Sequence, residues 1–388
     1  MDKQAKIIIG VIIAITVIAI GYGIYKKSNQ LAPTEPAITK PAEKEVIKIG
    51  APLSLTGKLA SFGEDIRDGI DMAVDEINQQ KKIKIEIIYE DTQSEATQAV
   101  SAVKKLIEIN NVNILLGPCR SDNVLAVAPI TEKKKVILFT SIASSVDITN
   151  AGDYVFRNRE TSKLSGEKMA EFLVSKEINK VAVFTAQSAT SLSYQKFFIE
   201  RFKKLGKEIV FSTEYSPSSL DFKTNIAKAK SAGSEAFYLS ATVGADAGIL
   251  TKQIRELGFS GLISGSNAFG TEEFLNGAGA TAEGVFLTSP AFNVENPDIQ
   301  NYRDKYKELY NKKSNAYAAN AYDAVKILAN AIEYCSGDKD TDCIRDFLYS
   351  VKDYQGIGGK TTFDKNGDVI KPVMIKVVKD GKFVPYEE

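Results

Sequence analysis

The chain has 388 residues, of which 44% are hydrophobic and 25% are charged. Its 49 Lys and Arg balance its 49 Asp and Glu, which argues against a nucleic-acid-binding protein, because such proteins usually carry a basic excess. It has no His and three Cys, which excludes Ser-His and Cys-His nucleophile pairs, His-containing metal sites and four-Cys zinc sites. We therefore expect a protein that is not an enzyme and that uses no cofactor or metal.

The N-terminus contains one long apolar stretch. Ile7 to Tyr25 carries no charge and approaches the roughly 20 residues that a membrane-spanning helix needs. A cleaved signal peptide has a shorter apolar core, so we predict a signal anchor over residues 1–27. Lysines flank the stretch on both sides and leave its orientation open. Prolines and few apolar residues over 28–45 predict an extended linker.

From Val46 onward, short apolar runs alternate with segments of helical spacing. In the first half the strands are expected at 46–53, 84–91, 112–118 and 136–141, and the helices at 63–78, 95–110 and 123–134. This alternation is typical of a parallel sheet with helical crossovers.

The same rhythm restarts after residues 154–162. Strands are expected at 180–186, 208–215, 236–240, 261–266 and 284–290, and helices at 165–176, 194–206, 222–232, 246–257, 296–311 and 320–334. Near the C-terminus, Asn366-Gly367 and Asp380-Gly381 each predict a hairpin turn. The fold class is therefore α/β, with two doubly wound parallel-sheet lobes that follow one transmembrane helix.

Two cysteines bracket the polar segment CSGDKDTDC. Cys335 and Cys343 are either two unrelated buried thiols or, as we favour, a local disulfide typical of an exported domain. Cys119 would then be a free thiol.

Small polar residues follow the expected strands in both halves. Ligands of doubly wound sheets bind at the carboxyl ends of the strands, where helix N-termini favour anions. Each Ser or Thr there also has a simpler interpretation as a helix N-cap. Because six such ends are poor in charge, we interpret them as one cleft for a small zwitterion or acid. They are 54–57, 117–122, 140–145, 189–191, 240–242 and 265–267.

The opening of the globular part resembles the leucine/isoleucine/valine-binding proteins, which are type I periplasmic binding proteins of ABC transporters. Their signature stands here as Ser54, Thr56, Gly57, the pair Phe62-Gly63 and the run 76–78 (Glu-Ile-Asn). Six further segments look like that family in its order: 89–107, 115–121, 128–144, 154–158, 321–333 and 356–368.

The resemblance implies two lobes that close on a ligand and are joined by three hinge crossings, expected near Thr161, Ser289 and Asp368. Lobe 1 would comprise 46–160 plus 289–368, and lobe 2 would comprise 161–288 plus 369–388. It also implies export, with the globular part on the extracytoplasmic side of the cell membrane. The implied partners are a small-molecule ligand, the permease and ATPase subunits of an ABC importer, and the membrane through the N-terminal helix.

The resemblance assigns binding roles to individual residues. In the first lobe Ser121 matches the carboxylate-binding serine, Ala143 and Ser145 match the segment after the fourth strand, and Phe62 matches the aromatic that packs on the ligand. Ser54, at the end of the first strand, completes that wall.

In the second lobe the match is weaker. Thr190 or Ser191 stands where the family has a tyrosine, and Thr242 stands at another tyrosine position. Asn267 aligns with the family's acid that pairs with an α-ammonium, and the loss of that acid lowers the expected preference for an α-amino acid. The expected ligand is a small amino acid or a related carboxylate or amide. A sensor that signals through a separate chain is the alternative to an importer subunit, and a carboxylate-dependent hydrolase is a third hypothesis without motif support.

Overall fold

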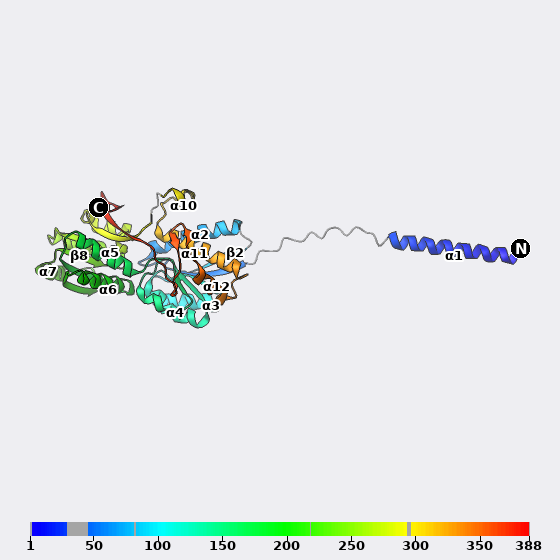
Figure 1. The fold of residues 1–388 in the computed structure, drawn as a ribbon, viewed down its shortest axis with the longest axis horizontal. Coiled ribbons are helices and arrows are strands. Elements are labelled where there is room, and N and C mark those ends of the chain that lie inside the picture. The colour runs from blue at the N-terminus through cyan, green and yellow to red at the C-terminus, as the bar shows by residue number, and fades with distance from the viewer. Residues whose placement is uncertain (1, 29–45, 81–82, 218, 293–295, 388) are drawn as a thin grey trace. The chain divides into compact units, whose positions relative to one another are not determined.

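The structure is a computed structural model of the whole chain and describes every residue except 1, 29–45, 81–82, 218, 293–295 and 388 (Figure 1). It divides into two compact units, residues 1–44 and 45–388.

The first unit contains a single described helix, α1 (Lys3–Ser28). By length and composition, Lys3–Lys27 is long and apolar enough to cross a membrane, and it is the one described helix that meets this test. The helix agrees with the span predicted over 1–27. The linker predicted over 28–45 lies outside the described residues apart from Ser28.

The second unit begins with a five-stranded parallel sheet in the order β2-β1-β3-β4-β5. Its strands are β1 (Val46–Leu53), β2 (Lys84–Asp91), β3 (Ile114–Leu116), β4 (Ile137–Thr140) and β5 (Val155–Arg157). Its helices are α2 (Ala60–Gln80), α3 (Ala96–Glu108), α4 (Ser121–Lys134), α11 (Ala316–Tyr334) and α12 (Thr341–Ser350). Helices α2, α11 and α12 share one apolar core with the sheet, and α3 and α4 share another on the opposite face.

A seven-stranded sheet follows, in the order β14-β13-β10-β9-β8-β6-β7. Its strands are β6 (Lys180–Ala186), β7 (Glu208–Tyr215), β8 (Ala236–Ser240), β9 (Leu262–Gly265), β10 (Phe286–Pro290), β13 (Val373–Lys379) and β14 (Lys382–Pro385). The first five are parallel and have the same relative order as the first sheet, while β13 and β14 add an antiparallel edge.

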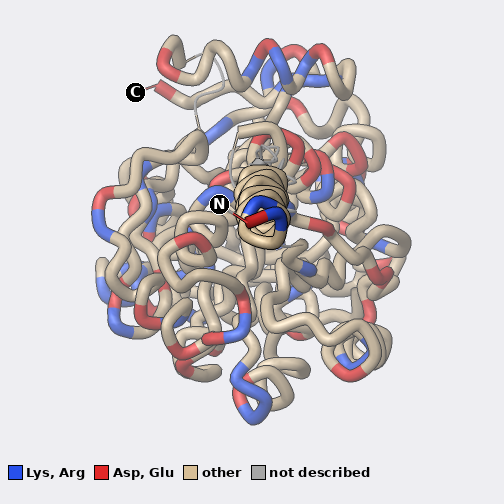
Figure 2. Tube along the Cα trace, turned by 90° about the vertical axis from the view of Figure 1, so that its right-hand side faces the viewer, with Lys and Arg blue, Asp and Glu red and all other residues tan. Residues whose placement is uncertain are grey.

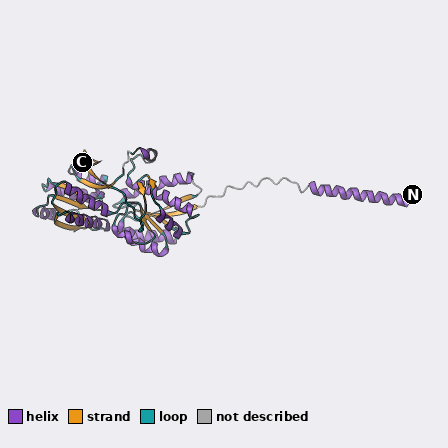
Figure 3. Cartoon of the chain, viewed as in Figure 1, coloured by secondary structure: helices purple, strands orange, loops and turns teal. Residues whose placement is uncertain are grey.

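Helices cover both faces of this second sheet as well, and Figure 3 shows the layered arrangement in both halves of the globular unit. They are α5 (Ser162–Ser175), α6 (Ala189–Lys204), α7 (Lys223–Ser231), α8 (Gly244–Glu256) and α9 (Glu272–Ala278). Within β6, Ala182 and Phe184 face the α7–α9 core, and Val181 and Val183 face the α5–α6 core. This alternation is the period of a strand buried on both faces.

The chain passes between the two sheets three times, as the fold class predicted. The first crossing follows β5, the second follows β10, and the third precedes β13. The predicted boundary at Ser289 falls inside β10, so the second crossing begins after Pro290. Helix α10 (Gln300–Tyr310) then packs against the first lobe, where Tyr302 and Tyr306 contact a core that includes Met72.

Of the two predicted hairpins, one forms a strand pair. Asp380-Gly381 joins β13 to β14, and both residues have the positive φ that such a turn requires. Around Asn366-Gly367, by contrast, the structure has only an isolated bridge between Phe363 and Val369. A separate short hairpin pairs β11 (Tyr354–Gly356) with β12 (Gly359–Thr361).

Short 3-10 segments complete the fold, namely η1 (Val146–Asn150), η2 (Asn267–Phe269), η3 (Gly279–Ala282) and η4 (Pro297–Ile299). Around the globular unit Lys and Arg are interspersed with Asp and Glu, as Figure 2 shows.

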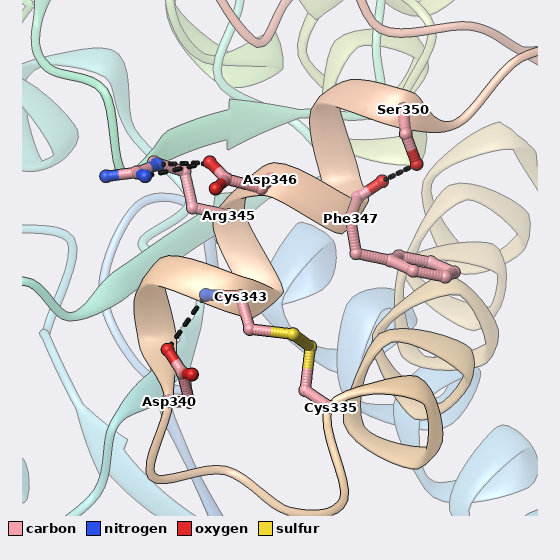
Figure 4. The surroundings of a disulfide bond; sticks show 7 residues. All are labelled: Cys335, Asp340, Cys343, Arg345, Asp346, Phe347 and Ser350. Carbon is pink, nitrogen blue, oxygen red and sulfur yellow. Dashed lines mark hydrogen bonds and ion pairs between the residues drawn. A yellow bond between two sulfur atoms is a disulfide. The ribbon is translucent and has the colours of Figure 1, made fainter.

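The predicted disulfide is present between Cys335 and Cys343, eight residues apart in sequence. Figure 4 shows that it joins the end of α11 to the first turn of α12, which is a helix that the sequence pattern did not reveal. The polar segment between the cysteines is thus a short helix connection, and Asp340 caps α12 by accepting a hydrogen bond from the Cys343 amide.

Replacing both cysteines by serine is expected to lower the free energy of unfolding of the globular unit by about 2–3 kcal/mol, because the cross-link restricts a short loop in the unfolded chain. Denaturant unfolding of the full chain in detergent, with and without reductant, measures this effect. The double Ser variant should be insensitive to reductant. Equal stability of wild type and variant would show that the bond contributes nothing.

Candidate ligand-binding site between the lobes

In both sheets, the carboxyl ends of the parallel strands face the other sheet. In each sheet the strand order reverses between the first and third strands along the chain, β1 and β3 in one and β6 and β8 in the other. Ligands of doubly wound sheets bind at this reversal, beyond the carboxyl ends of the strands. The loops after these four strands are therefore the natural walls of a cleft.

A close backbone approach shapes the first of these loops. A Cβ atom on Gly63 would lie 2.0 Å from the carbonyl oxygen of Ser54, so only glycine lets α2 start against the end of β1. This packing places Phe62 beside the cleft. It explains why the strand-to-helix junction combines small residues with one aromatic ring.

The lobes contact each other directly. Thr190 Oγ1 lies 2.8 Å from Ser121 Oγ, the Ala189 amide donates to Asp122 Oδ1 at 2.9 Å, and Asn267 Nδ2 donates to Tyr317 Oη at 3.2 Å. Between them lies a cavity of about 40 Å³. One water molecule needs about 10–15 Å³ of such a cavity, so the space holds only a few atoms, and a ligand the size of an amino acid needs the lobes to separate further.

Residues of both lobes line this cavity. Five of the predicted binding residues are among them, which are Phe62, Ala143, Thr190, Thr242 and Asn267. The other lining residues are Leu59, Cys119, Arg120, Ile142, Ser144, Arg159, Ala241 and Ala268.

Three predicted residues of the first lobe lie behind this wall. Ser121 is fully buried, and its hydroxyl oxygen accepts hydrogen bonds from the amides of Ser144 at 3.2 Å and Ser145 at 3.1 Å. The Ser145 hydroxyl caps η1 through the Asp147 amide, and Ser54 lies 3.3 Å from the Thr92 hydroxyl. In this closed arrangement these serines hold the loops that form the wall.

In the second lobe a hydroxyl cluster supports the opposite wall. Thr242 Oγ1 lies 2.7 Å from Ser188 Oγ and 3.0 Å from Ser191 Oγ. Ser188 is also the N-cap of α6 and accepts from the Ser191 amide. Thr242 therefore reaches the cavity, whereas Ser191 is buried behind it.

The sequence interpretation missed a buried arginine in the middle of the site. Arg159 is 2% exposed, and its guanidinium donates to the Ile142 carbonyl at 2.6 Å, to Glu160 Oε1 at 3.3 Å and to Tyr194 Oη at 3.4 Å. The available signal was the charge-rich stretch RNRE, which starts at the last residue of β5 and continues into the first hinge crossing. Charged residues are seldom fully buried, so the pattern alone did not indicate this position.

Two tyrosines were missed as well. Tyr194, on α6, accepts a hydrogen bond from Ser144 Oγ across the lobes at 3.3 Å. Tyr317 packs edge-to-face on Phe62, with ring centroids 5.0 Å apart, and Arg159 lies 5.3 Å from its ring centroid. The sequence pattern predicted a helix from residue 320, which left Tyr317 outside it. In the structure α11 begins at Ala316, with Asn315 as its N-cap, so Tyr317 lies in the first turn of the helix.

Two acidic side chains near the cleft do not face the cavity. Asp122 pairs with Arg120 at 3.1 Å and caps the Ala189 amide. Asp246 does not line the cavity, and burial raises its pKa to about 6, opposed in part by Lys58. Neither acid therefore faces the space where the resemblance places an ammonium group.

Cys119 is the free cysteine of the chain and lines the cavity. Burial raises the pKa of its thiol to about 11, so it remains protonated near neutral pH and serves as an apolar wall. Among the described residues, no group of three Cys, Asp or Glu side chains is arranged to hold a metal ion.

The sequence of this chain matches that of a known protein family. The sequence profile described as periplasmic binding protein matches residues 46–382. The chain belongs to the periplasmic binding protein family. The match spans both lobes and the three crossings, and it confirms the resemblance that the sequence motifs carried.

Relatives of this binding protein include amino-acid-binding proteins. It is 27% identical over 347 residues to Leu/Ile/Val-binding protein homolog 3 of Brucella melitensis, covering 88% of this chain and 94% of that protein. It is 24% identical over 330 residues to the leucine-, isoleucine-, valine-, threonine-, and alanine-binding protein of Pseudomonas aeruginosa, covering 84% and 87%.

Solved structures show the same two-lobed fold. The leucine binding protein LivK of Thermotoga maritima has a TM-score of 0.83 and 28% identity, covering 88% of this chain and 98% of that one. The branched-chain amino acid transporter substrate binding protein LivJ of Streptococcus pneumoniae, solved with isoleucine, has a TM-score of 0.79 and 28% identity, covering 88% and 100%.

Proposed function

We propose that this periplasmic binding protein is the extracytoplasmic substrate-binding subunit of an ABC importer. It binds a small amino acid or a related carboxylate or amide between its lobes and delivers the ligand to permease and ATPase subunits. The observation that carries the proposal is the cavity between the lobes, to which both contribute side chains. Ligand binding shifts the population toward an arrangement in which the lobes are closed around the ligand, because only then do both lobes contact it.

Helix α1 supports attachment to the cell membrane. It carries no acidic residue in its first turn, has lysines in its last turn, and none of its apolar span is buried. We infer that it remains as a single-pass anchor and keeps the binding unit near its permease. An intact-mass measurement on chain extracted from native membranes should give the full length, whereas a mass that lacks the first residues would identify a cleaved signal sequence.

Thermal unfolding of the full chain in detergent tests the binding function. After removal of carried ligand, we would add branched-chain amino acids, their keto analogues, short amides and small carboxylic acids, with glucose as the negative control. A ligand at about 1,000 times its Kd stabilises the folded state by roughly 4 kcal/mol, so the midpoint should rise clearly. If no member of the panel raises it above the glucose control, the proposed ligand class is wrong.

A further inference from the structure

Two arginines line the cavity, and no described acid does. Of the described residues that line it, Arg120 and Arg159 are the two that carry a charge. Each has a carboxylate partner outside the lining, Asp122 at 3.1 Å for Arg120 and Glu160 at 3.3 Å for Arg159. Both ion pairs therefore lie with their positive member at the cavity and their negative member behind it.

Arg159 keeps hydrogen-bonding capacity toward the cavity. A guanidinium has five N–H groups, and Arg159 uses three of them, for Glu160, the Ile142 carbonyl and Tyr194. One N–H on each terminal nitrogen has no partner among the described residues. These two N–H groups are donors that the oxygens of a carboxylate can accept from. Because buried donors without partners cost free energy, an acceptor at this point is favourable.

Arg120 adds a further donor on the same cavity. Its terminal nitrogens donate to the Ser94 carbonyl at 2.9 Å and to Asp122 at 3.1 Å. Its Nε is buried and has no hydrogen-bond partner among the described residues. The site thus has uncommitted donors from two cations.

The rest of the lining specifies the remainder of the ligand. Asn267 is neutral where an ammonium would need an acid, and it already donates to Tyr317. An ammonium beside two guanidinium groups would be repelled by them. Most of the other lining side chains are apolar, including Leu59 and Ile142. These surroundings therefore favour a ligand that is apolar apart from its carboxylate and that carries no positive charge.

We propose that Arg159, assisted by Arg120, binds the carboxylate of a small acid that has an apolar body and no ammonium group, and that the site discriminates against α-amino acids. The inference rests on the proposed binding function and narrows its ligand class to simple carboxylic acids and keto acids. Arg159 is then the residue that determines specificity.

Four probe molecules share an isobutyl group and differ in their charged groups, so they separate the effect of charge from that of shape. They are leucine, ketoleucine, isocaproate and isocaproamide. Isothermal titration calorimetry would measure the Kd of each for the full chain in detergent. Ketoleucine and isocaproate should bind at least about tenfold more tightly than leucine and isocaproamide, because they alone make a charge-assisted pair without bringing a cation.

Variants then test the arginine itself. Arg159→Gln should weaken both acids at least about tenfold and change isocaproamide by less than about threefold. The matched control is Arg201→Gln on α6, whose side chain is 30% exposed and pairs with Glu171 at the surface, and it should bind as wild type does. Arg159→Lys keeps the charge and should lose less affinity than Arg159→Gln.

The outcomes are distinguishable. Leucine binding as tight as ketoleucine or tighter would overturn this inference and leave the proposed binding function standing, and this ranking needs only the wild-type chain. An equal loss for acids and amide in Arg159→Gln would show a structural role for the arginine and would also overturn the inference. Absence of binding by all four probes, together with no shift in the wider thermal panel, would overturn the binding function as well.

Discussion

Arg157→Ala is expected to lower the free energy of unfolding by about 3–5 kcal/mol, because it leaves a buried carboxylate without its partner. Arg157 is fully buried at the end of β5, and its Nε and Nη2 both pair with Asp368, the second at 2.8 Å. Its other bonds reach the Ser145 carbonyl and the Thr149 hydroxyl, each at 2.6 Å. One side chain therefore connects the cleft loop after β4 to the segment that leads into the third crossing.

Denaturant unfolding of the full chain in detergent measures this loss. The matched control is Arg201→Ala, which removes an exposed ion pair with Glu171 and should cost no more than about 1 kcal/mol. We also expect the double variant with Asp368→Ala to be destabilised by less than the sum of the two single changes, since both remove one interaction. A loss for Arg157→Ala no larger than that of the control would contradict this account.

Ser121→Ala is expected to destabilise the globular unit by about 2 kcal/mol and to weaken ligand binding at least about tenfold, because two buried amides lose their acceptor. The hydroxyl holds the amides of Ser144 and Ser145 and meets Thr190 of the other lobe. Its removal releases the loop that carries Ser144 to the cavity and removes a contact that favours closure. The effect on affinity therefore comes through loop position and closure.

Calorimetry with the probe that raises the unfolding midpoint most would measure the affinity, and denaturant unfolding the stability. Ser101→Ala on α3 is the matched control, since that exposed hydroxyl donates to the Thr97 carbonyl within its own helix, and its loss should change stability by less than about 0.5 kcal/mol. Unchanged ligand affinity in Ser121→Ala would show that the serine does not contribute to the closed state.

The predicted binding residues fall into two groups, one that lines the cavity and one that lies behind it. Phe62, Ala143, Thr190, Thr242 and Asn267 line the cavity, whereas Ser54, Ser121, Ser145 and Ser191 are buried behind it, and of these Ser121 and Ser145 accept hydrogen bonds from backbone amides. A motif places a residue at the end of a strand, but it does not decide whether the hydroxyl faces the ligand or a neighbouring amide. That choice depends on which backbone donors the loop leaves unsatisfied.

Local patterns were sufficient for most of the fold. Buried strands of β-branched and aromatic residues alternate with amphipathic helices over both lobes, and this alternation requires a parallel sheet with covered faces. The Asp380-Gly381 turn and the Cys335–Cys343 bond are short-range features that their own residues specify. The polar strand ends lie at the edge of each sheet that borders the cavity between the lobes.

The tertiary structure alone decided the electrostatics of the cleft. Arg159 belongs to a charge-rich stretch in which the sequence pattern did not indicate a buried position, and it is buried because two lobes and Tyr317 close around it. Asp122 stands beside the predicted carboxylate site, yet Arg120 and the start of α6 direct it away from the cavity. The sequence by itself determined the elements, the two lobes and the edges where they meet, because these depend on local spacing. Which charges face the ligand depends on contacts between segments far apart in the chain, and only the folded structure brings those together.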